Sequence, residues 1–445
     1  MRKIETPKIT DPDFTGLDEL KQEIDKNREL LDSLNYPEYL HWEKIQYKEF
    51  QGRSSIDVWK LLKKYRVMES RKTIIRDENG KCFTWFKTQG IEKCLIAFDS
   101  SFSPKSIQEY LMTKEFFSSL IEESIASSVL EGASTTRKIA REMILTERKP
   151  RDVSEQMIIN NYNAMDKILN VYSDMEISLE ILFELHFILT NKTSLPENEQ
   201  GKFRLNEHNI TVQNTFDNDV LHIPPKMEFV RDEIKNLIDT ANDKIPIADS
   251  IIHPIVKAIM LHFWIGYLHP FTDGNGRLAR AIFYWYLLKN GYHKVIYFPV
   301  SLFLKNSPAK YKNAYIYSER DDNDLTYFIT YNTNSLISSS LMYINKLDRI
   351  EKILKTELDS FLAKYTLNER QKDFILTGLV DPDERNSFKK YMNIYKISRQ
   401  TAIKDLRSLE SQGLLISKKV GKIVYFYPGK AMKKSRSKRG KGLPQ

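Results

Sequence analysis

The chain has 445 residues, of which 41% are hydrophobic and 29% charged, so it is long enough for two or three globular domains with a polar surface. No apolar run reaches the roughly 20 residues of a membrane-spanning helix, and the first residues do not resemble a secretory leader. The two cysteines, Cys82 and Cys94, are too few for a disulfide framework or a cysteine-ligated zinc site. We therefore expect a cytoplasmic protein without a membrane segment.

The net charge of +9 is concentrated at the C-terminus. Seven cations and no acid lie there: Lys430, Lys433, Lys434, Arg436, Lys438, Arg439 and Lys441. Without these seven charges the remainder carries only +2, which is unremarkable for its size. We interpret residues 431–445 as a disordered basic tail, and the sequence leaves open whether it also faces nucleic acid.

Residues 1–105 predict a mixed α and β region whose role the sequence does not reveal. The stretch RKTIIRDENGKCFTWFKT, residues 71–88, alternates apolar and polar side chains on both sides of Asn79–Gly80. Asn-Gly is the favoured pair for a type I′ turn, so we expect a β-hairpin there.

Residues 106–349 show mainly helical periodicity and predict one large domain. Apolar residues recur at spacings of three and four in 109–132, 153–172, 178–190 and 255–268, and 278–291 is apolar on nearly every side. The stretch NITVQNTFDNDVLHIPPKM, residues 209–227, is instead β-prone and closes with two prolines. We predict a mainly α fold with a small β-hairpin flap in this stretch.

Residues 350–430 predict a linker helix followed by a winged helix-turn-helix domain. Ser398 is placed to cap a helix that ends before Gly413, and two strands follow around Gly421. An apolar stripe is expected on that helix at Ala402, Ile403, Leu406 and Leu409. Facing away from this stripe are four polar candidates for DNA contacts: Arg399, Gln400, Lys404 and Arg407. A dimerisation or partner-binding role for the module stays open beside DNA binding.

The twelve residues HPFTDGNGRLAR, starting at His269, carry the chemistry of the chain. Two helices flank this loop, and its glycines, Gly274 and Gly276, allow backbone N–H groups to converge on an anion at the start of the second helix. We assign the remaining roles as follows: Arg277 and Arg280 hold phosphates, Asp273 holds a divalent cation such as Mg²⁺, Asn275 bonds a phosphate oxygen or the loop, and His269 acts as a base. The loop therefore predicts the attack of an activated hydroxyl on a phosphoanhydride.

The same residues resemble the Fic family, whose signature is H-P-F-x-(D/E)-G-N-G-R-x-x-R. The match includes every fixed position: His269, Pro270, Phe271, Asp273, Gly274, Asn275, Gly276, Arg277 and Arg280. The resemblance implies a helical Fic fold over residues 106–349 and transfer of AMP from ATP to a Ser, Thr or Tyr hydroxyl of a protein, itself included. It also implies that His269 is the base, that Asp273 holds Mg²⁺, and that the γ-phosphate binds Arg280.

A second pattern, (S/T)-x-x-x-E-(G/N), resembles the inhibitory helix of the same family. Ser127, Glu131 and Gly132 occupy its fixed positions in SSVLEG. We expect Glu131 to pair with Arg280 and so to exclude the γ-phosphate. The resemblance further places target docking at the flap and a wall of the nucleotide pocket at Tyr311. Three other histidines, His186, His253 and His262, are interpreted as structural.

Several alternatives stay open at this level. The same site could remove AMP from a modified protein, with Glu131 positioning water, or transfer another nucleotide such as UMP. In a rival interpretation the protein is a DNA-binding regulator whose Fic domain senses nucleotide, although a sensor has no need of His269. A homodimer is compatible with the sequence, and the acceptor protein is not identified by it.

Overall fold

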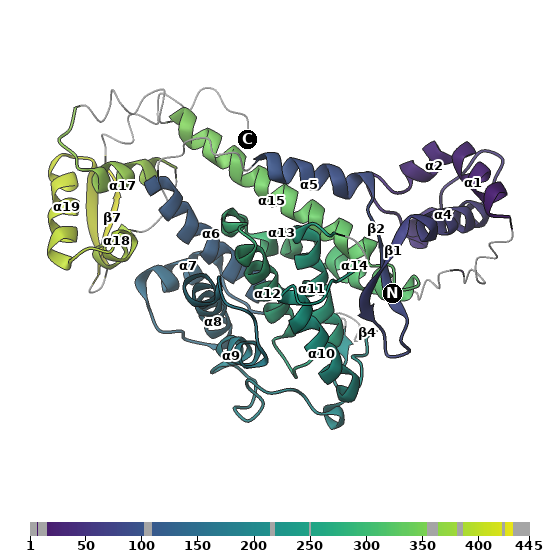
Figure 1. Ribbon diagram of the computed structural model, residues 1–445. Helices are drawn as coiled ribbons and strands as arrows, with labels where there is room; N and C mark the ends of the chain where they lie inside the picture. The colour runs from purple at the N-terminus through teal and green to yellow at the C-terminus, as the bar shows by residue number, and fades with distance from the viewer. Residues whose placement is uncertain are drawn as a thin grey trace. The chain divides into compact units, whose positions relative to one another are not determined.

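The computed structural model describes residues 7, 16–101, 109–213, 219–248, 251–353, 364–380, 386–420 and 423–429 (Figure 1). The basic tail at 431–445 and the strand-connecting Gly421 lie outside these residues. The chain divides into two compact units, the first built from residues 1–104, 122–134 and 152–340, the second from 105–121, 135–151 and 341–445.

The first unit opens with four helices and a β-hairpin. These are α1 (Leu17–Lys26), α2 (Arg28–Ser33), α3 (Trp42–Ile45), α4 (Ser55–Glu69), β1 (Ser70–Arg76), β2 (Cys82–Phe86) and then α5 (Gln89–Ser101). The antiparallel hairpin is confirmed, but the type I′ turn is wrong. Of its two turn residues, Gly80 alone has a positive φ, at 80°, whereas type I′ requires a positive φ at both. The Asp77 carboxylate accepts the N–H of Asn79, which favours a different turn.

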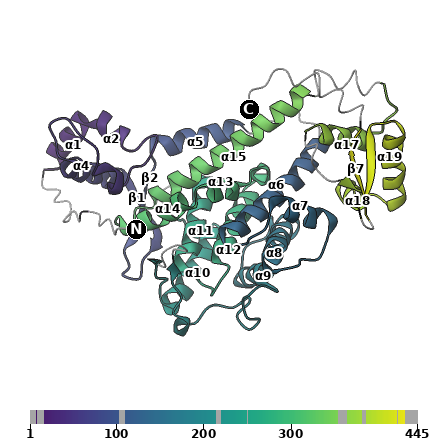
Figure 2. The same ribbon diagram turned by 180° about the vertical axis from the view of Figure 1, so that it is seen from behind.

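The rest of the first unit is a helical bundle. It comprises α6 (Glu109–Leu130, of which this unit takes the part from Glu122), α8 (Val153–Lys167), the π-helix Ile168–Tyr172, α9 (Leu179–Thr190), the 3-10 turn Asn206–His208, β3 (Val212–Gln213), β4 (Val220–His222), α10 (Met227–Ala241), α11 (Pro254–Leu268), α12 (Asn275–Lys289), the 3-10 turn His293–Tyr297, α13 (Val300–Asn306), α14 (Pro308–Arg320) and α15 (Thr326–Ile353, of which this unit takes the part up to Ser340). Both views place α11 and α12 side by side among the other helices of this bundle (Figures 1 and 2).

The two central helices form the core because their sequences are apolar on every side. Thirteen of the fifteen residues of α11 and thirteen of the fifteen of α12 are buried. Such helices are stable only when neighbours cover all their faces. The loop that joins α11 to α12 is therefore fixed at both ends by rigid elements, which suits a site that needs defined geometry.

The second unit holds a compact C-terminal module. Its elements are α17 (Glu369–Val380), β5 (Asn386–Ser387), α18 (Phe388–Tyr395), α19 (Arg399–Ser411), β6 (Leu415–Val420) and β7 (Ile423–Pro428), with the strands in the order β5-β7-β6. Ser398 caps α19 by accepting the N–H of Thr401 at 3.2 Å, and Gly413 follows the helix with a φ of 73°. Both caps agree with the sequence prediction.

One residue of the predicted apolar stripe on α19 does not belong to it. Ile403 is exposed, whereas the buried stripe contains Ala402, Leu406 and Leu409 together with Asp405. The Asp405 carboxylate is buried because it accepts hydrogen bonds from Asn368, Arg370 and Tyr391. Consecutive residues of an α-helix lie about 100° apart around its axis, so Ile403 lies outside the stripe that contains its neighbour Ala402.

The helix α7 (Arg137–Thr146) belongs to the same second unit and packs against the module. Asn393 of α18 donates to the carbonyl of Leu145 at 3.1 Å, and the Tyr425 hydroxyl of β7 donates to Glu142 at 3.2 Å. The module therefore uses α18 and β7 for this internal contact.

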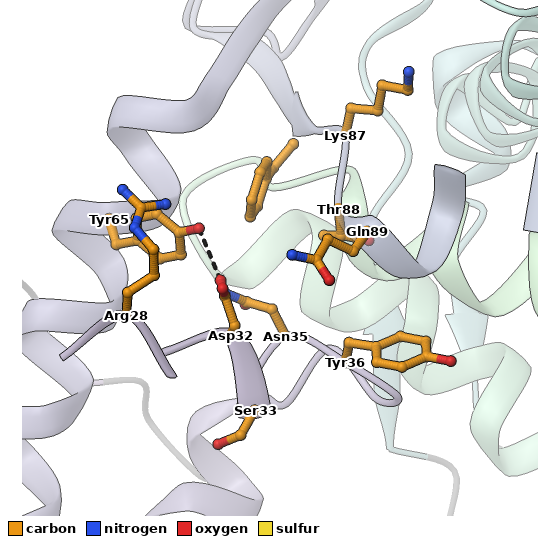
Figure 3. A pocket seen from close by; sticks show the side chains of 10 residues that line it. Arg28, Asp32, Ser33, Asn35, Tyr36, Tyr65, Lys87, Thr88 and Gln89 are labelled. Atoms are coloured by element: carbon orange, nitrogen blue, oxygen red, sulfur yellow. Dashed lines mark hydrogen bonds between the residues drawn. The ribbon is translucent and has the colours of Figure 1, made fainter. Parts of the chain in front are cut away.

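A polar cleft of about 360 Å³ opens beside α2 and α4 in the first unit (Figure 3). The Tyr65 hydroxyl donates to Asp32 at 2.9 Å across it. Two cations at its rim, Arg28 and Lys87, are paired with Asp25 and Glu92 outside the lining. Because these charges already have partners, we assign the cleft no ligand.

Candidate active site

The loop between α11 and α12 starts with a strained residue. His269 ends α11 in the left-handed region, with φ 47° and ψ 56°, a conformation that costs a residue other than glycine ~1 kcal/mol or more. The buried Arg204 supports it: its Nε donates to the His269 carbonyl at 2.7 Å, and its own N–H donates to Pro270 at 3.0 Å. The Arg204 guanidinium also donates to the carbonyl of Pro225, where the flap ends. Sequence reasoning missed Arg204, because a lone arginine 65 residues from its partner leaves no local pattern.

The His269 ring is a neutral base at neutral pH. Its Nδ1 lies 3.3 Å from the carbonyl of Gly266, an acceptor, so the ring proton belongs on Nδ1 and the lone pair on Nε2. Burial is the main cause that lowers the pKa of His269 to about 4, and the nearby His222 lowers it further. The imidazole is therefore ready to take a proton from a hydroxyl.

The start of α12 forms the floor of the site. Gly274 caps this helix with a φ of 82°, and a Cβ there would lie 3.0 Å from the Thr190 side chain. The helix N-terminus leaves backbone N–H groups directed outward, and its dipole attracts an anion. Asn275 spans the loop, since its side chain accepts from the N–H of Phe271 at 3.0 Å and donates to the carbonyl of the same residue at 2.8 Å. Of the two roles considered for Asn275, these bonds favour holding the loop.

Two buried arginines of α12 face the same space. Arg277 donates through Nη1 to the carbonyl of Leu189 at 2.7 Å and through Nη2 to Asp273 at 3.2 Å. Within the described part of the chain, Arg277 Nε and Arg280 Nη1 are buried and have no hydrogen-bond partner. A buried donor left unpaired costs ~1–3 kcal/mol, and more on a charged group. An anionic ligand would satisfy both donors.

Asp273 presents a carboxylate to solvent at the edge of this space. Its side chain is 49% exposed, and one oxygen lies 3.2 Å from Arg277. Among the residues whose placement is described, no group of three or more His, Cys, Asp or Glu side chains gathers around a point. A single exposed carboxylate still fits Mg²⁺, which is commonly held by one or two carboxylates together with substrate phosphates.

His186 of α9 holds the Asp273 backbone and is more than a structural filler. Its Nδ1 accepts the N–H of Gly201 at 2.9 Å, so its proton lies on Nε2, which donates to the Asp273 carbonyl at 2.8 Å. The ring stacks on Phe271, with centroids 3.8 Å apart. Burial lowers the pKa of His186 to about 4, which keeps this neutral form at neutral pH.

The helix α6 closes the site from the opposite side. Ser127 of α6 accepts from Arg280 Nε at 2.8 Å through its hydroxyl and from Nη2 at 2.9 Å through its carbonyl. Glu131, one turn later, accepts from Arg280 Nη2 at 2.8 Å. The helix ends at Leu130 and Gly132 has a φ of 94°, as the sequence predicted for its end.

The Glu131 carboxylate occupies the anion-binding space itself. A Cβ on Gly276 would lie 2.1 Å from Glu131 Oε1, so the carboxylate rests directly against the first turn of α12. Burial alone would raise the pKa of Glu131, but the charge of Arg280 and their hydrogen bond outweigh it and lower the pKa. The ionised carboxylate thus takes the place of a bound anion.

Tyr311 and His262 form the wall behind Arg280. Tyr311 of α14 exchanges a 2.8 Å hydrogen bond with Nε2 of His262, and its hydroxyl lies within the electrostatic reach of Arg280. Burial lowers the pKa of His262 well below its usual value. His253 caps the start of α11, where its Nδ1 accepts the N–H of Ile255 at 3.2 Å. A nucleotide contact at Tyr311 stays a prediction.

Comparison with known proteins decides the family of this site. Residues 176–287, from just before α9 almost to the end of α12, match the Fic/DOC family. The chain contains a Fic domain. Its bundle is also similar to the crystal structure of a Fic family protein from Desulfovibrio desulfuricans G20, with a TM-score of 0.50 and 15% identity over 80% of this chain and 98% of that one.

Curated relatives of the Fic domain are adenylyltransferases by name. The chain is 27% identical over 176 residues to protein adenylyltransferase Fic of Nematostella vectensis, a match that covers 38% of each chain. It is 36% identical over 73 residues to protein adenylyltransferase fic-1 of Caenorhabditis elegans, which covers 16% of this chain and 14% of that protein. The chain thus spans well under half the length of the curated relatives it matches.

Proposed function

We propose that this protein is a protein adenylyltransferase that moves AMP from ATP to a protein hydroxyl. The observation that carries the proposal is the arrangement around α12: a neutral His269, a helix N-terminus and two buried arginine donors that have no hydrogen-bond partner among the described residues. A base and an anion-binding floor in one space are what attack on a phosphoanhydride requires. The similarity to adenylyltransferases over the Fic domain supports the choice of AMP as the transferred group.

The residues divide the reaction among them. The acceptor hydroxyl, of a target protein or of this protein itself, attacks the α-phosphorus and loses its proton to His269 Nε2. The bond from the α-phosphorus to the bridging oxygen breaks, and pyrophosphate leaves. The N–H groups at the start of α12 and Arg277 hold the phosphates, and Arg280 Nη1 is available to the γ-phosphate. Mg²⁺, when bound by Asp273, would neutralise part of the phosphate charge.

We further propose that the protein rests in an inhibited state. Glu131 lies against Gly276 and takes one donor of Arg280, so a triphosphate and this carboxylate compete for the same positive charge. The negative charge of the Glu131 carboxylate repels a phosphate group that approaches Arg280. Removal of AMP by the same site and transfer of UMP are also compatible with the arrangement. Removal of AMP differs in its nucleophile, which is water, and transfer of UMP differs in the nucleobase of the bound nucleotide.

The test is transfer of label from ATP labelled at the α-phosphate. We expect weak labelling of the wild-type protein, stronger labelling of Glu131→Gly and none of Glu131→Gly with His269→Ala. Two control variants carry the same types of substitution, Glu to Gly and His to Ala, at positions outside the site. Glu147→Gly alters another helix-end glutamate, with φ 51°, and His253→Ala lies at the other end of α11. Labelling that survives the loss of His269 would overturn the assignment of the base.

Among the described residues, no helix is long and apolar enough to cross a membrane. A cytoplasmic location fits this finding and the two free cysteines, and it stays part of the proposal. A homodimer is likewise proposed only as compatible with the sequence.

The C-terminal module supports a second, separate proposal, namely that it is a winged helix that binds DNA. The order of α17, β5, α18, α19, β6 and β7 suits that fold, and Arg399, Gln400 and Lys404 of α19 are all exposed. Arg407 is exposed too but already pairs with Glu410 at 2.5 Å, so we rank it last. The double substitution Arg399→Ala and Lys404→Ala should weaken duplex binding and reduce its salt dependence by about two units of slope. Unchanged salt dependence would contradict the proposal and leave the nucleotide-sensor regulator without a DNA contact.

A further inference from the structure

A histidine of the flap strand β4 contacts the bundle through two partners. His222 Nε2 lies 2.8 Å from the carbonyl of Tyr267 on α11, and His222 Nδ1 lies 2.7 Å from Glu319 Oε2 on α14. The contact is well enclosed, with side-chain exposures of 10% for His222 and 20% for Glu319. Among the described residues, β4 pairs with the two-residue strand β3 alone, so bonds to the bundle such as these contribute strongly to where the flap lies.

Both partners of His222 are hydrogen-bond acceptors, and this restricts the protons on the ring. A carbonyl oxygen and an ionised carboxylate have no proton to give, whereas a neutral imidazole has a single N–H. A neutral ring would therefore turn one nitrogen lone pair toward an oxygen lone pair. Both short contacts are favourable when the ring and Glu319 hold two protons between them, and because histidine is the stronger base, both protons belong on the ring beside an ionised Glu319.

We propose that His222 is a positioning residue of the flap and that its doubly protonated form holds β4 beside His269. This inference rests on the proposed function, in which the flap presents the acceptor segment to the base. If the acceptor segment pairs with β4 as an added strand, its hydroxyl reaches His269 only when β4 keeps a fixed position relative to that residue. Loss of one proton from His222 would break the bond to Glu319 and leave β4 with the weaker set of bonds to Tyr267 and Arg320.

The charged surroundings of His222 are consistent with this role. From α14, Arg320 donates to the carbonyl of Leu221 at 3.3 Å, next to His222 on β4. From the β1–β2 turn, Asp77 and Glu78 act electrostatically on Tyr267, and Glu78 accepts the N–H of Lys226 at 2.7 Å. From the catalytic loop, His269 is a titratable group near His222, and it stays neutral at neutral pH because its pKa is about 4. Arg204 is the cation on that side, bonded to the His269 carbonyl.

The consequence is an alkaline limit on transfer that His269 does not cause. A base with a low pKa stays active as pH rises, so it limits the reaction only in acid. The flap behaves in the opposite way, because the anchor between His222 and Glu319 is present only while His222 holds both protons. We expect the loss of this anchor to raise the KM for the acceptor and to leave ATP binding unchanged.

The first test reads the protons directly and does not depend on activity. In protein with ring-labelled ¹⁵N histidine, His222→Gln identifies the resonances of His222 among those of the eight histidines. We expect both ring nitrogens of His222 to carry protons while both of its contacts are in place, and the backbone signals of Val220 and Leu221 to shift when one of these protons is lost. A His222 ring with a single proton in the folded protein, or flap signals that do not follow the ring signals, would overturn the proposal whether or not the protein transfers AMP.

The second test uses the partner of His222. In Glu131→Gly protein, self-labelling from ATP labelled at the α-phosphate should fall about tenfold as His222 loses its second proton, the equivalent of one charge-assisted hydrogen bond. Glu319→Gln should remove this decline, because the glutamine amide can donate to Nδ1 of a neutral ring. Asp322→Asn neutralises an acid near the end of α14 that pairs with Lys81, and it should keep the decline. A decline that persists in Glu319→Gln would contradict the role of His222, while absence of label from every variant would contradict the proposed function instead.

Discussion

Single residues outside the signature fix the geometry of the residues inside it. Arg204 supports the left-handed His269, and His186 bonds the backbone of Asp273. The signature and its buried flanking helices were predictable from the sequence, because fixed spacing and continuous apolarity are local properties. His186 and Arg204 were not, because each acts on a loop far along the chain and neither belongs to a pattern.

His186→Phe tests the support of Asp273. Phenylalanine keeps the stacking on Phe271 but loses both hydrogen bonds, so the Asp273 carbonyl and the Gly201 N–H are left unpaired. We expect a loss of transfer of roughly 10–100-fold and a higher Mg²⁺ requirement, as for other residues that support a metal ligand. The measurement is the rate of labelling in Glu131→Gly protein across a Mg²⁺ series. An unchanged Mg²⁺ requirement would limit His186 to packing.

At the scale of elements, α6 and α12 face each other through a polar ladder. Ser127 of α6 and Glu131, just after its end, bond Arg280 of α12, and one turn before Ser127, Glu123 accepts from the hydroxyl of Tyr284 at 2.9 Å. Glu123 also accepts from the N–H of Ser301 at 3.0 Å, and burial raises its pKa. Because the residues lie four apart on each helix, one face of α6 is matched to one face of α12. The sequence pattern predicted the Glu131–Arg280 contact, whereas Glu123 escaped notice because its partner Ser301 lies on another helix.

Glu123→Ala tests whether this ladder sets the inhibited position of α6. Without Glu123 the helix loses a fixed point two turns before Glu131, so Glu131 should leave Arg280 more often and labelling should rise severalfold. In Glu131→Gly protein the same substitution should add no further activation, because the inhibiting carboxylate is already gone. Equal activation in both backgrounds would show that Glu123 acts on the reaction by another route.

At the scale of the whole molecule, four histidines with lowered pKa values make its stability depend on pH. Burial lowers the pKa of His41, of His186 and of His269 to about 4 in each case, and that of His262 well below its usual value. His41 stacks on Tyr317 with centroids 3.9 Å apart and caps α3, so it belongs to the fold and not to the catalytic loop. Composition predicted a globular protein, but which histidines become buried depends on contacts between distant segments.

The sign of this pH dependence follows from the lowered pKa values. Each group stabilises the fold fully above the ordinary histidine value of about 6.5, and this contribution is lost as pH falls toward 4. We expect the free energy of unfolding to be about 2 kcal/mol lower at pH 5 than at pH 7.5 for each of these histidines. Urea unfolding of the wild-type protein and of His186→Phe at the two pH values checks this. The variant should lose the His186 share of the decline, about 2 kcal/mol, and an equal decline in both proteins would contradict the assignment.

The most direct test of the central claim compares two labels on one substrate. Glu131→Gly protein is incubated with ATP labelled at the α-phosphate and, separately, at the γ-phosphate, and the protein-bound label is counted. Adenylyl transfer with a catalytic His269 predicts label from the α position alone, weaker labelling of the wild-type protein, and none after His269→Ala. Label from the γ position, or wild-type protein labelled as strongly as Glu131→Gly, would contradict an adenylyltransferase restrained by Glu131.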